Sequence, residues 1–260
     1  MGNLPDRDKK SRVVLLPDCS FFAITDKGGR ERNEDAILAV DTGDYFVFGI
    51  ADGLGGHARG EMASGIAIAE LARVDADALS ALDPELLLLQ VFAEANLEIV
   101  RYNREQGVNS GTTLTACVAS GDGRCTIGNL GDSRAWVIGG TGSWHTKDHS
   151  YLQQLIDAGE LTEREAIRHP RANIITRALG LERGCVPDIY NVDADGRVLV
   201  LSSDGIHDFI EPDRFRRLAV TPGAHEAAQA LIDAAVDGGS TDNLSVIVCR
   251  FDGCAPRLEP

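Results

Sequence analysis

Four aspartates in this chain each end an apolar segment and precede a small or turn-forming residue. They are Asp52 before Gly53, Asp132 before Ser133, Asp204 before Gly205 and Asp242 before Asn243. A single Asp-Gly or Asp-Asn pair after a strand predicts only a turn, because these residues are common turn formers. Four such pairs in one chain, with Glu34-Asp35 in addition, favour a shared acidic site over four unrelated turns.

The electrostatic cost of such a site indicates what it would hold. Two carboxylates about 4 Å apart repel each other by about 4 kcal/mol at an effective dielectric constant near 20. Several such pairs would match the whole stability of a typical domain, roughly 5–15 kcal/mol. If the aspartates converge, a positive charge must therefore lie between them. Oxygen ligands without His or Cys favour Mg²⁺ or Mn²⁺ over zinc. The residue spacing does not by itself show that they converge.

Other patterns that handle phosphate are weak or absent. Residues 53–58 fit G-x-G-x-x-A, with Asp75 about twenty residues further on, as in a dinucleotide-binding turn. Asp52 would then face the pyrophosphate, and the strands that follow suggest hairpins instead of βαβ units. The chain has no G-x-x-x-x-G-K-[ST] motif and no cysteine followed six positions later by arginine. A nucleotide-binding fold is therefore disfavoured, and the expected nucleophile of a phosphate-ester hydrolase is water, not cysteine.

The amino-acid composition limits the binding partners and the cellular compartment that can be expected for this protein. The 260 residues include 25 Lys and Arg against 40 Asp and Glu, a net charge of −15. Such a chain repels nucleic acids and anionic membranes, so neither is expected as a partner. Six cysteines without a C-x-x-C pair, and an N-terminus without an apolar signal segment, predict free thiols in a soluble cytoplasmic protein.

The elements that would position these residues are strands in hairpin groups with helices between them. Strands are predicted at residues 20–25, 36–41, 45–52, 112–120, 124–131, 134–140, 197–204 and 243–251. Helices are predicted at residues 60–74, 84–106, 151–158 and 224–236, and the capping box Thr162-x-x-Glu165 opens a short one. Asp83 is the expected N-cap before Pro84. The pattern predicts an α+β layered domain with two sheets inside and helices outside.

Eight motifs occur in a fixed order along the chain. They are Arg30-Glu31-Arg32-Asn33-Glu34-Asp35, Ala51-Asp52-Gly53-Leu54-Gly55-Gly56-His57, Gly111-Thr112-Thr113, Gly128-Asn129-Leu130-Gly131-Asp132-Ser133-Arg134, Asp148-His149-Ser150, Asn173-Ile174-Ile175-Thr176-Arg177-Ala178-Leu179-Gly180, Ser202-Ser203-Asp204-Gly205 and Ser240-Thr241-Asp242-Asn243. Together they resemble the metal-dependent protein phosphatases of the PP2C (PPM) type in their compact bacterial form. The resemblance implies a four-layer αββα sandwich of two mainly antiparallel sheets. It also implies an N-terminal extension at residues 1–19, one phosphatase domain at residues 20–254 and a flap at about residues 151–172.

The resemblance implies a set of metal ligands. Asp52 is expected to bridge two cations, Mn²⁺ or Mg²⁺, with the Gly53 carbonyl on one of them. Asp204 and Asp242 are expected to hold the other. Asp132 is expected to share a third, weaker cation with Asp204.

The resemblance also implies catalytic roles. Arg30 is expected to bind the substrate phosphate through its fork of donors. Glu34 would bind a cation through water, and Asp35 would orient the waters on the cations. Leu54 occupies a position where some relatives carry a histidine, so the group that protonates the leaving group stays open. His57 is expected to be structural.

Arginines of the expected flap have two interpretations. Arg164, Arg168 and Arg171 could form a basic rim that receives a phosphopeptide. They could equally be a solvated helix face paired with Glu163 and Glu165.

The function implied is hydrolysis of phosphoserine and phosphothreonine in proteins by a water or hydroxide that bridges two divalent cations, without a phosphoenzyme. A monomer that opposes a Ser/Thr kinase and acts on that kinase's phosphorylated substrates is expected. Two alternatives remain: a catalytically silent module of the same fold that binds phosphoproteins, and a phosphatase of small metabolites.

Overall fold

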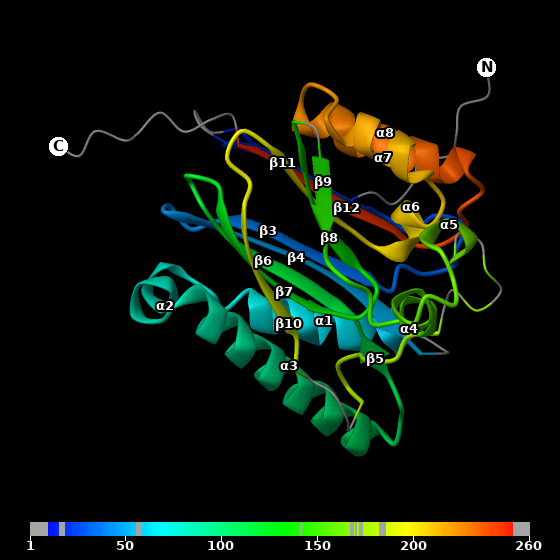
Figure 1. The fold of residues 1–260 in the computed structure, drawn as a ribbon. Coiled ribbons are helices and arrows are strands. Elements are labelled where there is room, and N and C mark those ends of the chain that lie inside the picture. The colour runs from blue at the N-terminus through cyan, green and yellow to red at the C-terminus, as the bar shows by residue number, and fades with distance from the viewer. Residues whose placement is uncertain are drawn as a thin grey trace.

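Two sheets lie face to face at the centre of the protein (Figure 1). The structure, a computed structural model, describes residues 10–15, 19–55, 59–140, 142–166, 169, 171, 174–181 and 186–251. The first sheet consists, in spatial order, of β1 (Lys10–Leu15), β2 (Cys19–Asp26), β12 (Leu244–Phe251), β11 (Val198–Ser202), β8 (Arg134–Gly139) and β9 (Gly142–His145). The second consists of β10 (Asp188–Asp193), β7 (Arg124–Leu130), β6 (Leu114–Ser120), β4 (Tyr45–Leu54) and β3 (Asp35–Asp41), with β5 (Gly111–Thr112) paired to β4. The strand pairs are antiparallel, as the short turns predicted.

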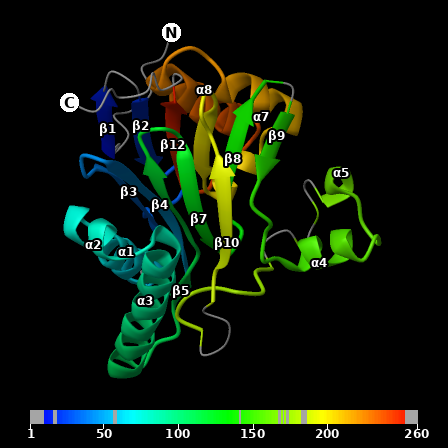
Figure 2. The ribbon, with the colours of Figure 1, turned by 60° about the vertical axis from the view of Figure 1, so that its left-hand side comes forward.

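Helices cover the outer faces of both sheets, which confirms the predicted αββα sandwich (Figure 1). The helices beside the first sheet are α6 (Asp204–His207), α7 (Pro212–Ala219) and α8 (Ala224–Asp237). Those beside the second are α1 (Gly60–Leu71), α2 (Ala76–Ala81) and α3 (Pro84–Gln106). Figure 2 shows α4 (Tyr151–Asp157) and α5 (Glu163–Ala166) projecting to one side of the sheets, where the flap was expected.

The strands are apolar on both faces because each sheet is covered twice. In β2, Phe21 and Ala23 face the layer between the sheets, whereas Phe22 and Ile24 face α8 and its neighbours. Phe21 and Phe48 meet edge to face in the inter-sheet layer, with ring centroids 5.1 Å apart. This central apolar layer holds the two sheets in a fixed relation, and so fixes the loops at their ends.

Helix starts follow the predicted capping residues. Asp83 accepts a hydrogen bond from the Glu85 backbone N–H, and the helix it caps runs over the predicted residues 84–106. The Thr162 hydroxyl and the Glu165 carboxylate form the predicted capping box.

Six elements, most of them short or at the edge of a sheet, were not predicted. They are β1, β9, β10, α2, α6 and α7. Edge strands expose one side to water and carry polar residues, so their apolar signal is weak. Residues 10–15, placed in the expected extension, pair with β2. The predicted strand 197–204 stops at Ser202, because Asp204 begins a helix, and the predicted helix 60–74 stops at Leu71.

Some predictions concern residues outside the described ranges. Gly56, His57, Arg168 and Asn173 are among them, and so are residues 1–9 of the expected extension. None of the helices in the described ranges combines the length and apolar character that a membrane crossing requires.

We expect the inter-sheet layer to dominate stability. Phe48 is fully buried there, so Phe48→Ala should lower the free energy of unfolding by about 3–5 kcal/mol in urea titrations. Leu86→Ala on α3, where the side chain is 57% exposed, should change it by no more than about 0.5 kcal/mol. Similar losses in the two variants would contradict this account of the core.

Candidate functional site

Separate elements bring the acidic residues to the same end of the two sheets. Asp35 opens β3 and lies opposite Asp52 of β4 in the antiparallel register. Asp204 begins α6 just beyond β11, and Asp132 lies in the turn between β7 and β8. Asp242 lies two residues before β12. Asp35 and Asp242 lie at or just before the starts of strands, whereas Asp52 and Asp204 lie at or just beyond the ends of strands. Antiparallel pairing brings such starts and ends to the same edge.

Four of these carboxylates form one buried group, the acidic cluster of Asp35, Asp52, Asp132 and Asp204. Asp35 and Asp52 are direct partners in the antiparallel register, and the carboxylates of Asp132 and Asp204 lie close enough to Asp52 to act on its charge. Burial raises the pKa of Asp52 well above its ordinary value, and the charges of the other three carboxylates raise it further. Burial likewise raises the pKa of Asp35 and of Asp204 to about 6. The convergence that the spacing alone did not show is therefore present.

The acidic cluster has oxygen atoms that fit a hard cation. One buried carboxylate oxygen on each of Asp35, Asp132 and Asp204 has no hydrogen-bond partner. The other oxygen of Asp35 accepts a hydrogen bond of 2.6 Å from the Ser245 hydroxyl. A buried negative charge without a partner is costly, and a divalent cation removes that cost.

The present side-chain positions limit how such an ion binds. Within the described ranges, no three His, Cys, Asp or Glu side chains are spaced to hold one ion as they stand. Mg²⁺ commonly keeps several waters and takes only one or two carboxylates. An all-oxygen site with few protein ligands per ion therefore fits the cluster.

Arg30 and Asp242 lie together at the rim of the acidic cluster. The Arg30 guanidinium donates a hydrogen bond of 2.8 Å to the Asp242 carboxylate, and the two side chains are 55% and 29% exposed. The charge of Asp242 raises the pKa of both Asp35 and Asp204, although burial is the larger cause. Burial also raises the pKa of Glu34, whereas nearby Arg30 lowers it. The predicted phosphate-binding arginine and a predicted metal ligand are thus direct neighbours.

Asn243 joins the two loops that carry these rim residues, and sequence reasoning did not single it out. Its side-chain oxygen accepts a hydrogen bond from the Glu34 N–H at 2.8 Å. Its side-chain nitrogen donates to the carbonyls of Lys27 and Arg32, both at 2.9 Å. An asparagine directly after a site aspartate was the available signal, but the same pair also predicts a plain turn.

Two glycines beside the acidic cluster are required by close packing, not by turn geometry. A Cβ atom on Gly53 would lie 2.4 Å from the Gly60 carbonyl oxygen at the start of α1. One on Gly205 would lie 2.1 Å from the Asn243 carbonyl oxygen. Neither glycine has a positive φ angle. The Asp-Gly pairs therefore allow another backbone segment to approach the aspartate closely.

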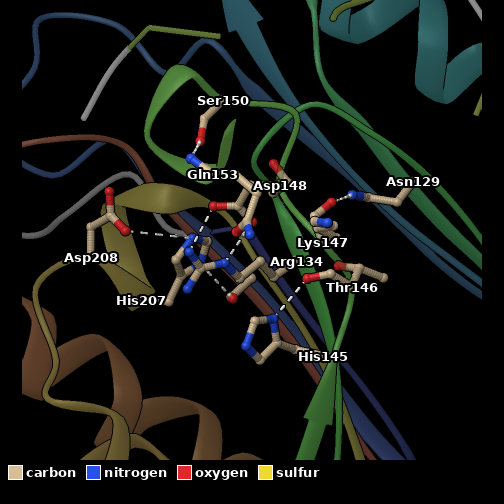
Figure 3. Close-up of polar contacts among 12 residues, drawn as sticks. Asn129, Arg134, His145, Thr146, Lys147, Asp148, Ser150, Gln153, His207 and Asp208 are labelled. Carbon is tan, nitrogen blue, oxygen red and sulfur yellow. Dashed lines mark hydrogen bonds and ion pairs between the residues drawn. The ribbon is translucent and has the colours of Figure 1, made fainter. Parts of the chain in front are cut away.

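A second polar group, which includes Arg134, Asp148 and Asp208, is drawn in Figure 3. It shares a cavity with Asp132. Arg134 donates two hydrogen bonds of 2.7 Å to the carboxylate of Asp148. Burial raises the pKa of Asp208 to about 7, and its carboxylate lies 3.8 Å from Nε2 of the buried His207. These residues line a cavity of about 120 Å³ between α4 and α7. The sequence analysis did not identify Asp208. Its i, i+4 spacing from Asp204, where α6 begins, places the two aspartates on the same side of that helix.

The segment that leads into the expected flap is bonded to the turn that carries Asp132. The Gly131 N–H donates to Nδ1 of His149, and the His149 N–H donates to the Gly131 carbonyl. Arg171 lies over the ring of Tyr151 and contacts its hydroxyl, so it does not pair with a glutamate in the described part of the flap. The side chain of Arg164 lies outside the described residues.

The raised carboxyl pKa values predict how pH acts on the protein without cations. Because the folded state keeps protons on Asp35 and Asp204 up to about pH 6, their contribution to stability is full below about pH 4 and is lost as pH rises through 6. In EDTA, the melting temperature should therefore fall more steeply from pH 5 to pH 7 in the wild type than in Asp204→Asn. Excess Mn²⁺ should raise the melting temperature of the wild type most at pH 7. Equal pH slopes in the two proteins would contradict this assignment.

Comparisons with known proteins agree on one family. The family model of protein phosphatase 2C matches residues 28–235. The serine/threonine protein phosphatase PstP of Mycobacterium tuberculosis is 35% identical in an alignment of 252 positions that covers 92% of this chain and 46% of PstP. The chain therefore spans about half the length of that relative. The serine/threonine phosphatase stp of Listeria monocytogenes is 32% identical in an alignment of 238 positions that covers 88% of this chain and 94% of stp.

A solved structure shows the same fold. The crystal structure of the catalytic domain of PstP in complex with two manganese ions superposes with a TM-score of 0.78 at 31% identity. The alignment covers 90% of this chain and 98% of that domain. The sheets, helices and loops described above are therefore those of a known catalytic fold.

Proposed function

Because this chain belongs to the protein phosphatase 2C family, we propose that it hydrolyses phosphoserine and phosphothreonine esters in proteins with two divalent cations, Mn²⁺ or Mg²⁺. The observation that carries this proposal is the acidic cluster, in which buried carboxylate oxygens without partners meet at one end of the sandwich. The two manganese ions in the PstP catalytic domain support the choice of cation.

In this proposal, two ions share the acidic cluster. Asp52 would contribute to both, and the Gly53 carbonyl would bind one of them. Asp204 and Asp242 would hold the other, and Asp132 with Asp204 would hold a third, weaker ion. When bound, the cations supply the Lewis acidity that activates water and neutralises charge on the phosphate.

Other residues bind and orient the reacting groups. Arg30 is half-exposed at the rim, where a guanidinium can exchange Asp242 for two oxygens of a phosphate. Asp35, fixed by the Ser245 hydroxyl, keeps one buried oxygen available to orient water. Glu34 acts through a water at the same rim. The four cysteines in the described ranges, Cys19, Cys117, Cys125 and Cys249, are buried, so none of these four is placed to act as a nucleophile.

The wider setting follows the same proposal. The phosphatase domain spans residues 20–254, and β1 adds an edge strand to its first sheet. The substrates are proteins phosphorylated by a Ser/Thr kinase that the enzyme opposes. We further infer a monomer in the cytoplasm. The four described cysteines, all free, support a reducing compartment.

The first test is a metal-dependent assay with p-nitrophenyl phosphate and a phosphothreonine peptide. We expect turnover of both with Mn²⁺, none in EDTA, and a loss of at least about 100-fold in kcat in Asp204→Asn, because a ligand charge is removed. Tight phosphopeptide binding without turnover would support a silent module instead. A higher kcat/KM on sugar phosphates than on phosphopeptides would support a metabolite phosphatase.

Arg30→Ala tests phosphate binding separately from metal binding. Losing a charged hydrogen-bond pair should raise KM for the phosphopeptide about 10-fold or more. Mn²⁺ affinity, measured by calorimetry, should not fall, because Asp242 then loses a competing cation. Arg124→Ala, in an exposed ion pair at the far hairpin, is the control and should change neither. An unchanged KM in Arg30→Ala would rule out this role.

A further inference from the structure

A groove of about 780 Å³ lies beside the acidic cluster, along the outer edge of β3. It is bounded by β3, by β2 where Ala23 and Thr25 lie, and by α1 where Gly65 lies. Asp35 belongs to the acidic cluster and also lines the groove. The groove is therefore continuous with the proposed catalytic site, yet most of it has no part in the phosphate chemistry.

The backbone of β3 presents hydrogen-bonding groups to this groove. β3 is the last strand of its sheet, and in the described part of the chain it pairs with β4 alone. Gly53 N–H donates to the Glu34 carbonyl, and Thr113 N–H donates to the Asp52 carbonyl on the other side of β4. Because bonded and non-bonded pairs alternate in an antiparallel ladder, the N–H and C=O of Ile37 point away from β4.

The available edge is short. The Asp35 N–H already donates a hydrogen bond of 3.2 Å to the Asn33 side-chain oxygen, and Ala39 already has a polar partner. Pairing is therefore centred on Ile37, where one residue of an added strand can form two backbone hydrogen bonds. Residues on either side of it would continue along the groove.

Apolar side chains flank this edge on both faces. Ile37 and Ala23 belong to the inter-sheet layer, and Leu38 packs against the layer under α1. A Cβ atom on Gly65 would meet no atom within 4 Å, so α1 leaves space above the groove. Successive side chains of an added strand point to opposite faces, and each face here offers an apolar surface.

We propose that the β3 groove binds, as an added β-strand, an extended apolar segment beside the phosphorylated residue of a protein substrate. The inference rests on the proposed phosphatase activity, because the phosphate must reach the acidic cluster at the end of the groove. Backbone bonds at Ile37 supply affinity that does not depend on sequence, and the two apolar faces select side chains. Substrates with Val, Leu or Ile next to the phosphorylated residue are then preferred over those with Gly or Asp.

Phosphothreonine peptides test the backbone pairing directly. Two series carry either Val-Leu-Val or Gly-Asp-Gly on the amino-terminal or the carboxyl-terminal flank, and a third places an N-methyl group at each flanking position in turn. On one of the two flanks, replacing Val-Leu-Val by Gly-Asp-Gly should lower kcat/KM about tenfold, and so should an N-methyl group on the same flank. The first change removes apolar contacts and the second removes a hydrogen bond. Equal kcat/KM across all peptides on both flanks would overturn the proposal. Turnover of p-nitrophenyl phosphate tests the proposed activity by itself, because this substrate has no flanks.

Gly65→Gln tests the groove from the side of α1. The longer side chain occupies the space above the groove on an exposed helix position, where replacing glycine favours the helix. The ratio of kcat/KM for the Val-Leu-Val peptide to that for p-nitrophenyl phosphate should fall about tenfold. Ala69→Gln, exposed one turn further along α1 and outside the groove lining, should leave the ratio unchanged. An unchanged ratio in Gly65→Gln would overturn the proposal.

Discussion

Mutual repulsion among buried carboxylates is the constraint on which this end of the molecule depends. Asp35, Asp52, Asp132 and Asp204 come from four separate segments and share one small volume. Protonation or a bound cation can relieve their repulsion, and the raised pKa values show that protonation does so when cations are absent. At neutral pH the same geometry therefore favours divalent cations. The free energy that the apolar layers contribute to folding holds the acidic cluster in place against its own charge.

The arginines near the acidic cluster lie at its margins and not at its centre. Arg30 pairs with Asp242 at the solvent-exposed rim, and Arg134 pairs with Asp148 on the side facing the flap. Among the described residues, neither guanidinium donates a hydrogen bond to Asp52 in the centre of the acidic cluster. A fixed arginine there would neutralise the carboxylates permanently and compete with cations. The half-exposed Arg30 can instead exchange its partner, which suits the proposed binding and release of a phosphorylated substrate.

The sequence predicted the layered α+β fold well because each buried strand is covered on both faces and has a continuous apolar pattern. It predicted edge strands poorly, since β9 and β10 are short or alternate with polar residues. For the site, residue types could identify Asp52 and Asp204 but not that they meet, because convergence depends on pairing between distant strands. The contact between Arg30 and Asp242 joins residues 212 positions apart, and no local pattern encodes it.

The Asp-Gly pairs show why a local interpretation was incomplete. An Asp-Gly pair after a strand suggests a turn glycine with a positive φ angle, but Gly53 and Gly205 have no such angle. Each is instead in contact with a second backbone segment that a side chain would push away. The aspartate supplies charge, and the glycine supplies the close approach that concentrates this charge with others. The acidic cluster therefore requires a glycine after each of these two aspartates so that the backbone segments can pack closely. A substitution at either glycine would move the carboxylates apart, although every carboxylate would still be present.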